Sequence, residues 1–273
     1  MTHLYTLAFP DEPLAAKFGM VSVPAQIVMD ADEAADDPYL DFDIVAKNLG
    51  CDYFDNSQAE LDCMRQVSWV QIEEFINRYN STPEIAFTLY IPDEKYIFLN
   101  ETSRYSEGKF AAGPAFRSDV AREHPDPNTT EVESSEAASD CLAADDIALR
   151  YAAGLDTYRY WYAGNFTNIS PVPWLGAFHW TDLLMIFGTY NEDVGQISQL
   201  EVETSQTMQD FMLAFLKDAN TVNVSVGWPL YEPDAPQGGM IIEFGMQVPA
   251  KNITGEYVDG ACSNSSLTFP LDG

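Results

Sequence analysis

Positive charge is scarce in this sequence. Among its 273 residues, 13 are Lys or Arg and 43 are Asp or Glu, which gives a net charge of −30 at pH 7. Such a chain repels the phosphates of nucleic acids and the surfaces of anionic membranes. Long apolar runs are lacking too, since no run reaches the roughly 18 residues of a transmembrane helix. These absences exclude nucleic acid partners and a membrane span, and the 46% apolar content predicts a single domain over residues 1–273.

Metal-binding patterns are also missing. The cysteines form no C-x-x-C pair and have no histidines at metal-ligand spacing, so we expect neither a metal nor a cofactor. Their even number favours disulfides, for which four cysteines allow three pairings. An excess of N-x-[ST] sequons points to glycosylation in the secretory pathway. The cysteines are Cys51, Cys63, Cys141 and Cys262, and the sequons begin at Asn80, Asn100, Asn128, Asn165, Asn168, Asn223, Asn252 and Asn264.

A secretion signal is not visible, although these features indicate a secreted protein. The chain opens with MTHLYTLAFPDEPLAAKFGMV, which has no cationic segment and only a short apolar run. We therefore expect that residues preceding Met1 are missing from this sequence, most simply because of an incomplete gene model.

Both helices and strands are expected. Apolar residues at helical spacing predict helices within 37–51, 68–80, 141–154 and 205–220, with a capping box from Ser68 to Gln71. Aromatic and β-branched residues predict strands within 114–120, 157–166 and 239–245, and two short strands around a Pro-Asp turn within 84–100. Residues 124–140 read as a polar loop. The mixture indicates the α/β class.

Four segments resemble the carboxylesterase type-B, or cholinesterase-like, family, and they occur in the chain in the same order as in that family. WLGAFHWTDLLMIFGTY (174–190) is similar to the family's G-x-x-H-G-[ST/x]-[DE]-L-x-x-x-F-G segment around the triad histidine. VAKNLGCDYFDNSQAELDCMRQVS (45–68) looks like its short disulfide loop, and RYSEGKFAAGPAFRSDVARE (104–123) like the segment that delivers the triad acid. FMLAFLKDAN followed by GWPLY (211–220 and 227–231) resembles its late helix and WPxY ending. The match covers nearly the whole chain.

The resemblance implies part of an α/β-hydrolase fold and ester hydrolysis by a Ser-Glu-His triad. His179 would be the general base, and Glu123 would orient its imidazole from just beyond a sheet strand. Taken alone, His179 reads as a hydrogen-bonded core histidine and Glu123 as a solvated surface acid. The resemblance also implies the disulfides Cys51–Cys63 and Cys141–Cys262.

The nucleophile of that triad is absent from the sequence. The family needs a G-x-S-x-G elbow, and none of the 16 glycines belongs to one. The segment THLYTLAFPDEPL looks like the part that follows the elbow, and Ser22 matches a structural serine beyond it. Because the oxyanion hole depends on the elbow and on an earlier glycine-rich loop, we expect no esterase activity from this chain.

The sequence departs from the family at two further places. Trp180 stands where glycine follows the triad histidine, and we expect its indole to crowd the site. His124 stands where glycine follows the acid, in the shortened loop 124–140, and reads first as a loop residue. The leading interpretation is the C-terminal portion of a secreted esterase acting on small esters or lipid esters. The alternatives are a noncatalytic cholinesterase-like adhesion protein and an unrelated acidic glycoprotein; the sequence does not fix the oligomeric state.

Overall fold

A computed structural model describes most of the chain. The described residues are 2–11, 13–21, 39–53, 55–83, 85, 92–120, 141, 143–170, 176–191 and 195–263. They form two compact units, one with the described residues up to 21 and from 100 onward, the other with those from 39 to 99. The single domain over residues 1–273 stays a prediction.

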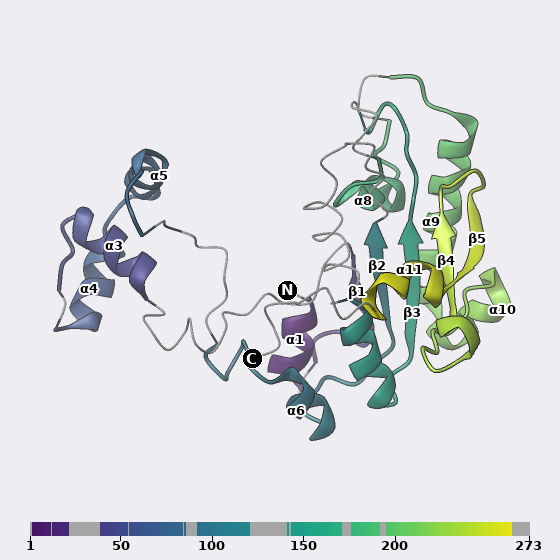
Figure 1. Cartoon of the computed structure of the whole chain (residues 1–273), viewed down its shortest axis with the longest axis horizontal. Coiled ribbons are helices and arrows are strands. Elements are labelled where there is room, and N and C mark those ends of the chain that lie inside the picture. Colours follow the sequence, from purple (N-terminus) through teal and green to yellow (C-terminus); the bar gives the residue numbers. More distant parts are fainter. Residues whose placement is uncertain are drawn as a thin grey trace. The chain divides into compact units, whose positions relative to one another are not determined.

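A mixed five-stranded sheet forms the centre of the larger unit (Figure 1). Its strands follow one another in chain order: β1 (Phe18–Met20), β2 (Ala115–Val120), β3 (Thr157–Tyr162), β4 (Met240–Phe244) and β5 (Ala250–Thr254). The first four are mutually parallel and β5 is antiparallel to β4. The predictions of β2, β3 and β4 are confirmed. Parallel strands covered on both faces are rich in large side chains, which accounts for the run TYRYWY in β3.

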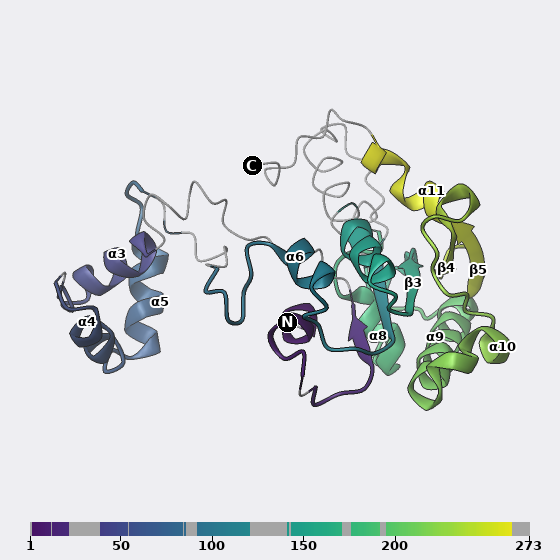
Figure 2. The ribbon, with the colours of Figure 1, turned by 90° about the horizontal axis from the view of Figure 1, so that it is seen from below.

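Helices cover both faces of this sheet. They are α1 (Thr2–Ala8), α6 (Glu101–Ser106), a helix over 143–152, α8 (Thr181–Phe187), α9 (Gln199–Lys217), α10 (Val222–Val226) and α11 (Gly255–Asp259). Single turns of 3-10 helix occur at Ala219–Thr221, Pro236–Gly238 and Gly260–Ser263. Figure 2 shows α9 and α10 on one side of the sheet and α11 on the other. This arrangement is that of an α/β protein, as the sequence predicts.

The main core lies between the sheet and α9. Met208, Phe211, Met212 and Phe215 form one buried stripe on α9, within the helix predicted over 205–220. They pack against Trp228, which is fully buried, and against the tyrosines of β3 that face this side. The Trp228 indole N–H donates to the carbonyl of Arg159 at 3.0 Å, so its one polar atom is satisfied.

The smaller unit contains α3 (Leu40–Asn48), α4 (Ser57–Met64) and α5 (Trp69–Arg78). The predicted capping box from Ser68 to Gln71 is present at the start of α5. Cys51 and Cys63 are joined by a disulfide, as the resemblance implies. Of the two strands predicted within 84–100, the described residues 92–100 contain none. The Asp93 carboxylate accepts hydrogen bonds from the N–H groups of residues 95, 96 and 97 and so holds this segment as a turn.

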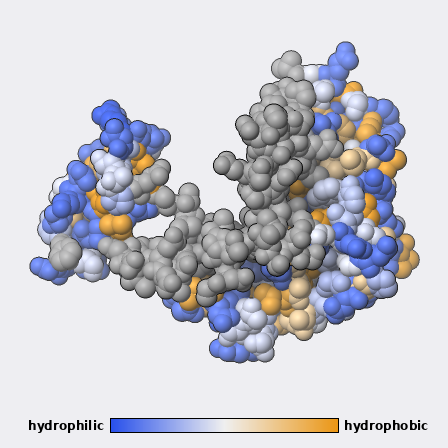
Figure 3. Space-filling model, in the orientation of Figure 1, coloured by the Kyte–Doolittle hydropathy of each residue, from blue (hydrophilic) through white to orange (hydrophobic). Residues whose placement is uncertain are grey.

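The surface agrees with the composition. Figure 3 shows hydrophilic residues over much of the visible face, with small apolar patches between them. Among the described residues, no helix has the length and apolar character needed to cross a membrane.

Candidate active site

The turn that carries His179 lies at the carboxyl end of the parallel strands. Figure 1 shows α8 beside the arrowheads of β2 and β3. Residues 178–180 form the turn that leads into this helix, and hydrogen bonds fix its shape. The N–H and the hydroxyl of Thr181 both donate to the carbonyl of Phe178, at 3.1 and 2.6 Å, and the N–H of Leu183 donates to the carbonyl of Trp180 at 3.0 Å. Carboxyl ends of parallel strands are where α/β folds place their binding sites.

Asp182 attaches the first turn of α8 to the sheet. Its buried carboxylate accepts a hydrogen bond from the Ser118 hydroxyl of β2 at 3.1 Å and one from the Tyr160 hydroxyl of β3 at 2.9 Å. Burial and the negative charge of Asp182 raise the pKa of Tyr160 well above its usual value. The hydroxyl of Tyr160 therefore stays neutral and remains a hydrogen-bond donor. Through Asp182, the turn that carries His179 is held to both β2 and β3.

The His179 side chain is exposed rather than buried. Within the described part of the chain it has no hydrogen bond or ion pair, so it is not the satisfied core histidine that the residue alone would suggest. Glu123 lies outside the described residues, as do Ser22, His124 and the loop 124–140. Strand β2 ends at Val120, three positions before Glu123. The pairing of Glu123 with His179 therefore stays a prediction.

Trp180 has an unusual backbone. Its φ is +68°, in the left-handed region, and its side chain is 47% exposed. Side chains with a Cβ are disfavoured there, which explains why the resembled motif has glycine at this position. The indole lies 5.7 Å from the Phe178 ring, centroid to centroid, at an interplanar angle of 86°. Crowding of the site by Trp180 stays a prediction.

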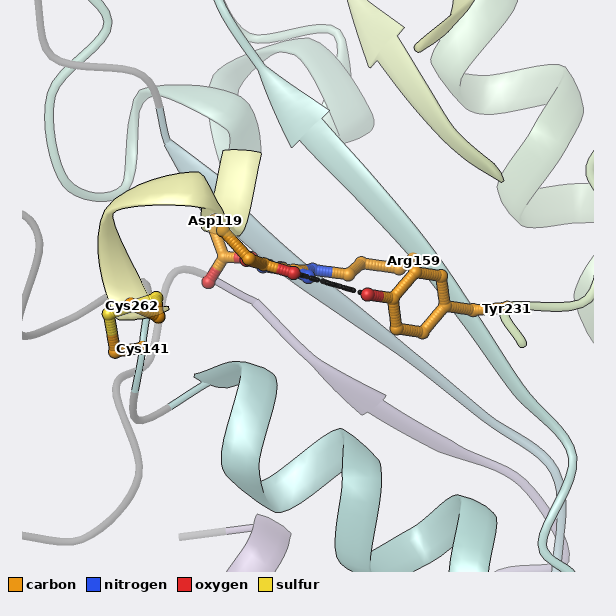
Figure 4. The surroundings of a disulfide bond; sticks show 6 residues. Asp119, Cys141, Arg159, Tyr231 and Cys262 are labelled. Atoms are coloured by element: carbon orange, nitrogen blue, oxygen red, sulfur yellow. Dashed lines mark hydrogen bonds and ion pairs between the residues drawn. A yellow bond between two sulfur atoms is a disulfide. The ribbon is translucent and has the colours of Figure 1, made fainter. Parts of the chain in front are cut away.

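On the other face of the sheet, Arg159 of β3 joins three segments (Figure 4). Its guanidinium donates to Asp119 at 2.8 and 3.0 Å and, through two nitrogens, to Asp259 of α11 at 2.6 and 2.8 Å. Tyr231 contacts the same group. Burial alone lowers the pKa of Arg159, but the two carboxylates raise it well above its usual value. The disulfide Cys141–Cys262 lies nearby and confirms the second implied pairing.

A second buried ionic network surrounds His3 of α1. His3 Nε2 lies 2.8 Å from Glu101 Oε2 of α6, and Nδ1 lies 3.0 Å from Asp146 Oδ1 on helix 143–152. Arg117 of β2 pairs with the other Asp146 oxygen at 2.7 Å. Burial alone lowers the pKa of His3, but the two carboxylates raise it to about 9. Sequence reasoning missed both networks, because no local pattern connects residues about a hundred positions apart.

The glycosylation sequons differ in exposure. The asparagines at 80, 100, 165, 223 and 252 are exposed, whereas Asn168 is 6% exposed and its amide donates to the carbonyl of Tyr190 at 3.0 Å. Burial of this amide argues against a glycan at Asn168. The sequons at Asn128 and Asn264 lie outside the described residues.

Comparison with known proteins places this chain near esterases and lipases. Chlorogenic acid esterase of Aspergillus niger is 34% identical over 252 residues, which cover 84% of this chain and 48% of the esterase. Secreted lipase 5 of Gibberella zeae is 31% identical over 226 residues, 73% of this chain and 42% of the lipase. The chain thus spans about half the length of these curated relatives. No family model matches it.

The fold comparison agrees. An esterase from anaerobic Clostridium hathewayi, described as able to hydrolyze aliphatic aromatic polyesters, superposes with a TM-score of 0.59 at 17% identity. The superposition covers 94% of this chain and 58% of that esterase. This chain therefore has part of an α/β-hydrolase fold, and by sequence it is a relative of an esterase and a lipase.

Proposed function

We propose that this chain supplies the general base and the triad acid of a secreted carboxylic-ester hydrolase of the type-B carboxylesterase family. His179 is the base and Glu123 is its carboxylate partner. The names of the two curated relatives, an esterase and a secreted lipase, support small esters or lipid esters as substrates. The nucleophilic serine belongs to a segment outside this sequence, so the chain as given is inactive.

One observation carries this proposal. His179 is an exposed residue on a turn that buried hydrogen bonds of Asp182 tie to β2 and β3, at the carboxyl end of the sheet. A general base must be reachable by substrate and yet be held in place, and this turn provides both conditions. In the sequence, Glu123 comes three positions after the end of β2, the strand that supplies one of the donors to Asp182, and this supports the proposed pairing with His179.

The chemistry follows from these groups. A serine hydroxyl that attacks the ester carbonyl carbon gives its proton to the neutral imidazole of His179. The carboxylate of Glu123 fixes the tautomer and stabilises the imidazolium. The imidazolium then returns the proton to the departing alcohol, and a water molecule repeats the sequence to release the acid. Without the serine, no acyl-enzyme forms.

The first experiment uses the chain as it stands. We expect no hydrolysis of p-nitrophenyl butyrate above the rate in buffer and no covalent label from a fluorophosphonate reagent. Stoichiometric labelling would contradict the proposal, because it would reveal a nucleophile within residues 1–273. Reading the coding sequence upstream of Met1 is a separate check, in which an in-frame G-x-S-x-G is the expected result. A start site without one would favour the noncatalytic binding protein instead.

A chimera tests the roles of the two residues. The part of the Aspergillus niger esterase that precedes the region matched by this chain is fused to residue 1. We expect restored esterase activity that falls by about 10⁶-fold in His179→Ala and by about 10⁴-fold in Glu123→Gln. Phe187→Ala, at the exposed far end of α8, is the matched control and keeps the activity. An active chimera in which His179→Ala has no effect would overturn the assignment.

A further inference from the structure

The Phe178–Trp180 turn presents an aromatic corner at the candidate site. The two rings stand at 86° to each other with their centroids 5.7 Å apart. Phe178 packs against the main core of the larger unit, whereas the Trp180 indole is 47% exposed. One wall of the corner is therefore anchored by the core, and the other is open to solvent.

Burial does not explain why tryptophan occupies position 180. A bulky residue at φ +68° is an outlier, because its Cβ crowds the neighbouring carbonyl oxygen. Such conformations persist where the surroundings impose them, and they cluster at ligand and catalytic sites. Here the turn is imposed by the hydrogen bonds of Thr181 and Leu183 and by buried Asp182. Glycine would adopt this backbone conformation more easily. The presence of an indole at position 180 therefore calls for a functional explanation.

Stacking of a substrate ring is a purpose that fits this geometry. Aromatic rings prefer offset stacking or edge-to-face contact with centroids about 4.5–7 Å apart. A third ring entering a corner of two nearly perpendicular rings can stack on one and meet the other edge-on. Because Trp180 directly follows His179 and both side chains are exposed, a ring held on the indole would bring an attached ester group into the neighbourhood of the base.

We propose that Trp180, with Phe178, forms an aromatic subsite that binds the ring of an aromatic ester beside His179. Trp180 is thus a specificity-determining residue that directs the enzyme toward aromatic esters. This inference rests on the proposed hydrolase function. The charge of the chain adds a second effect, because a net charge of −30 repels an anionic acid but not a neutral ester. The subsite therefore binds the substrate more tightly than the carboxylate product.

The test measures binding and needs no catalysis. Methyl 3-phenylpropanoate and its ring-saturated analogue, methyl 3-cyclohexylpropanoate, are titrated into the wild-type chain, and ligand-observed NMR gives the affinities. The two probes have the same heavy atoms and differ in the saturation of the ring, so that only one of them offers a planar π system. We expect the aromatic probe to bind about threefold to tenfold more tightly, the range that aromatic contacts supply. The indole N–H resonance of Trp180 is identified as the one that is missing from the spectrum of Trp180→Phe. We expect this resonance of the wild type to shift when the aromatic probe is added.

Matched variants identify the residue responsible. Trp180→Gly fits the left-handed backbone, so its fold is retained, as a thermal melt will check, and we expect it to lose the preference for the aromatic probe. Phe187→Ala removes a ring of 73% exposure from the far end of α8 and keeps the preference. Equal affinities of the wild type for the two probes, or an unchanged preference in Trp180→Gly, would overturn the subsite. Tetramethylammonium is a further probe, because exposed aromatic rings can also bind cations. If it binds more strongly than the aromatic probe, the two rings form a cation site, and the proposed subsite is wrong.

The subsite and the hydrolase function fail in distinguishable ways. If the wild-type chain discriminates between the probes but the chimera with a nucleophile elbow has no esterase activity, the subsite stands and the proposed function fails. If the chimera hydrolyses esters through His179 but the chain does not discriminate between the probes, the function stands and the subsite fails.

Discussion

Asp182 and Tyr160 are joined by a buried hydrogen bond of 2.9 Å, which connects the helix after His179 to the middle of the sheet. The same carboxylate oxygen accepts the Ser118 hydroxyl at 3.1 Å. One acid thus fixes the distance between α8 and two parallel strands. Neither hydroxyl has bulk water as an alternative partner, because both residues are buried.

Removing this acid should be costly. Asp182→Ala leaves two buried hydroxyls without their acceptor, and we expect the free energy of unfolding to fall by about 3 kcal/mol. Tyr160→Phe removes one donor and keeps the other, so its loss should be about 1 kcal/mol. Urea denaturation measures both, and the double variant should show coupling, because the residues share one bond. Additive effects would mean that the bond contributes nothing to stability.

The His3 network predicts a loss of stability at high pH. The pKa of His3 is about 9 in the folded chain against 6.5 in the unfolded chain, so folding favours the protonated imidazole. Its contribution is complete below pH 6.5 and disappears as the pH rises through 9. Wild type should lose about 3 kcal/mol over this window because His3 sits between Glu101 and Asp146. His3→Gln should flatten the profile, and an unchanged profile in this variant would contradict the role of His3.

Arg159 should not tolerate lysine. An ammonium group cannot reproduce the paired contacts that the guanidinium makes with Asp119 and Asp259, so one buried carboxylate would lose its partner. We expect Arg159→Lys to lower the free energy of unfolding by about 3 kcal/mol. Arg78→Lys, in an exposed pair with Glu74, is the control and should leave the denaturation midpoint unchanged. A midpoint for Arg159→Lys equal to that of the wild type would refute this account.

Substitutions at position 180 should reverse the usual order of alanine and glycine. Trp180→Ala keeps a Cβ in the left-handed region, so we expect Trp180→Gly to be the more stable of the two by about 1 kcal/mol. At Phe187, the last residue of α8, we expect alanine to be the better residue instead. Thermal melts of Trp180→Ala, Trp180→Gly, Phe187→Ala and Phe187→Gly measure the order of stability at each position. The same order at both positions would show that Trp180 is not strained.

The neighbouring sequons should differ in occupancy. In chain expressed through a fungal secretory pathway, we expect a glycan at Asn165, which is exposed. We expect none at Asn168, because the nitrogen that would carry it is buried and donates to the carbonyl of Tyr190. Glycopeptide mass spectrometry distinguishes the two sites. A glycan at Asn168 in folded protein would contradict the placement of this segment.

Local patterns in the sequence account for much of the fold. The apolar stripes of α3, α5 and α9, and the capping boxes of α5 and α9, depend on residues three or four positions apart. The apolar and aromatic runs in β2, β3 and β4 identify buried strands. The three-residue β1 and the exposed β5 have no such signal, because pairing with a neighbour is what makes them strands. The number of cysteines allows three pairings, and only the resemblance to the esterase family predicted the two disulfides that the structure contains.

The sequence by itself determined the class of fold, the cysteine pairs through resemblance, and His179 as the residue to question. Only the tertiary structure decided that His179 is exposed, that Asp182 holds its turn to the sheet, and that Trp180 adopts a left-handed backbone. The reason is physical: helix caps and periodicity depend on neighbours along the chain, whereas buried ion pairs such as those of His3 and Arg159 join residues about a hundred positions apart. Such contacts exist only once the sheet has brought its strands together.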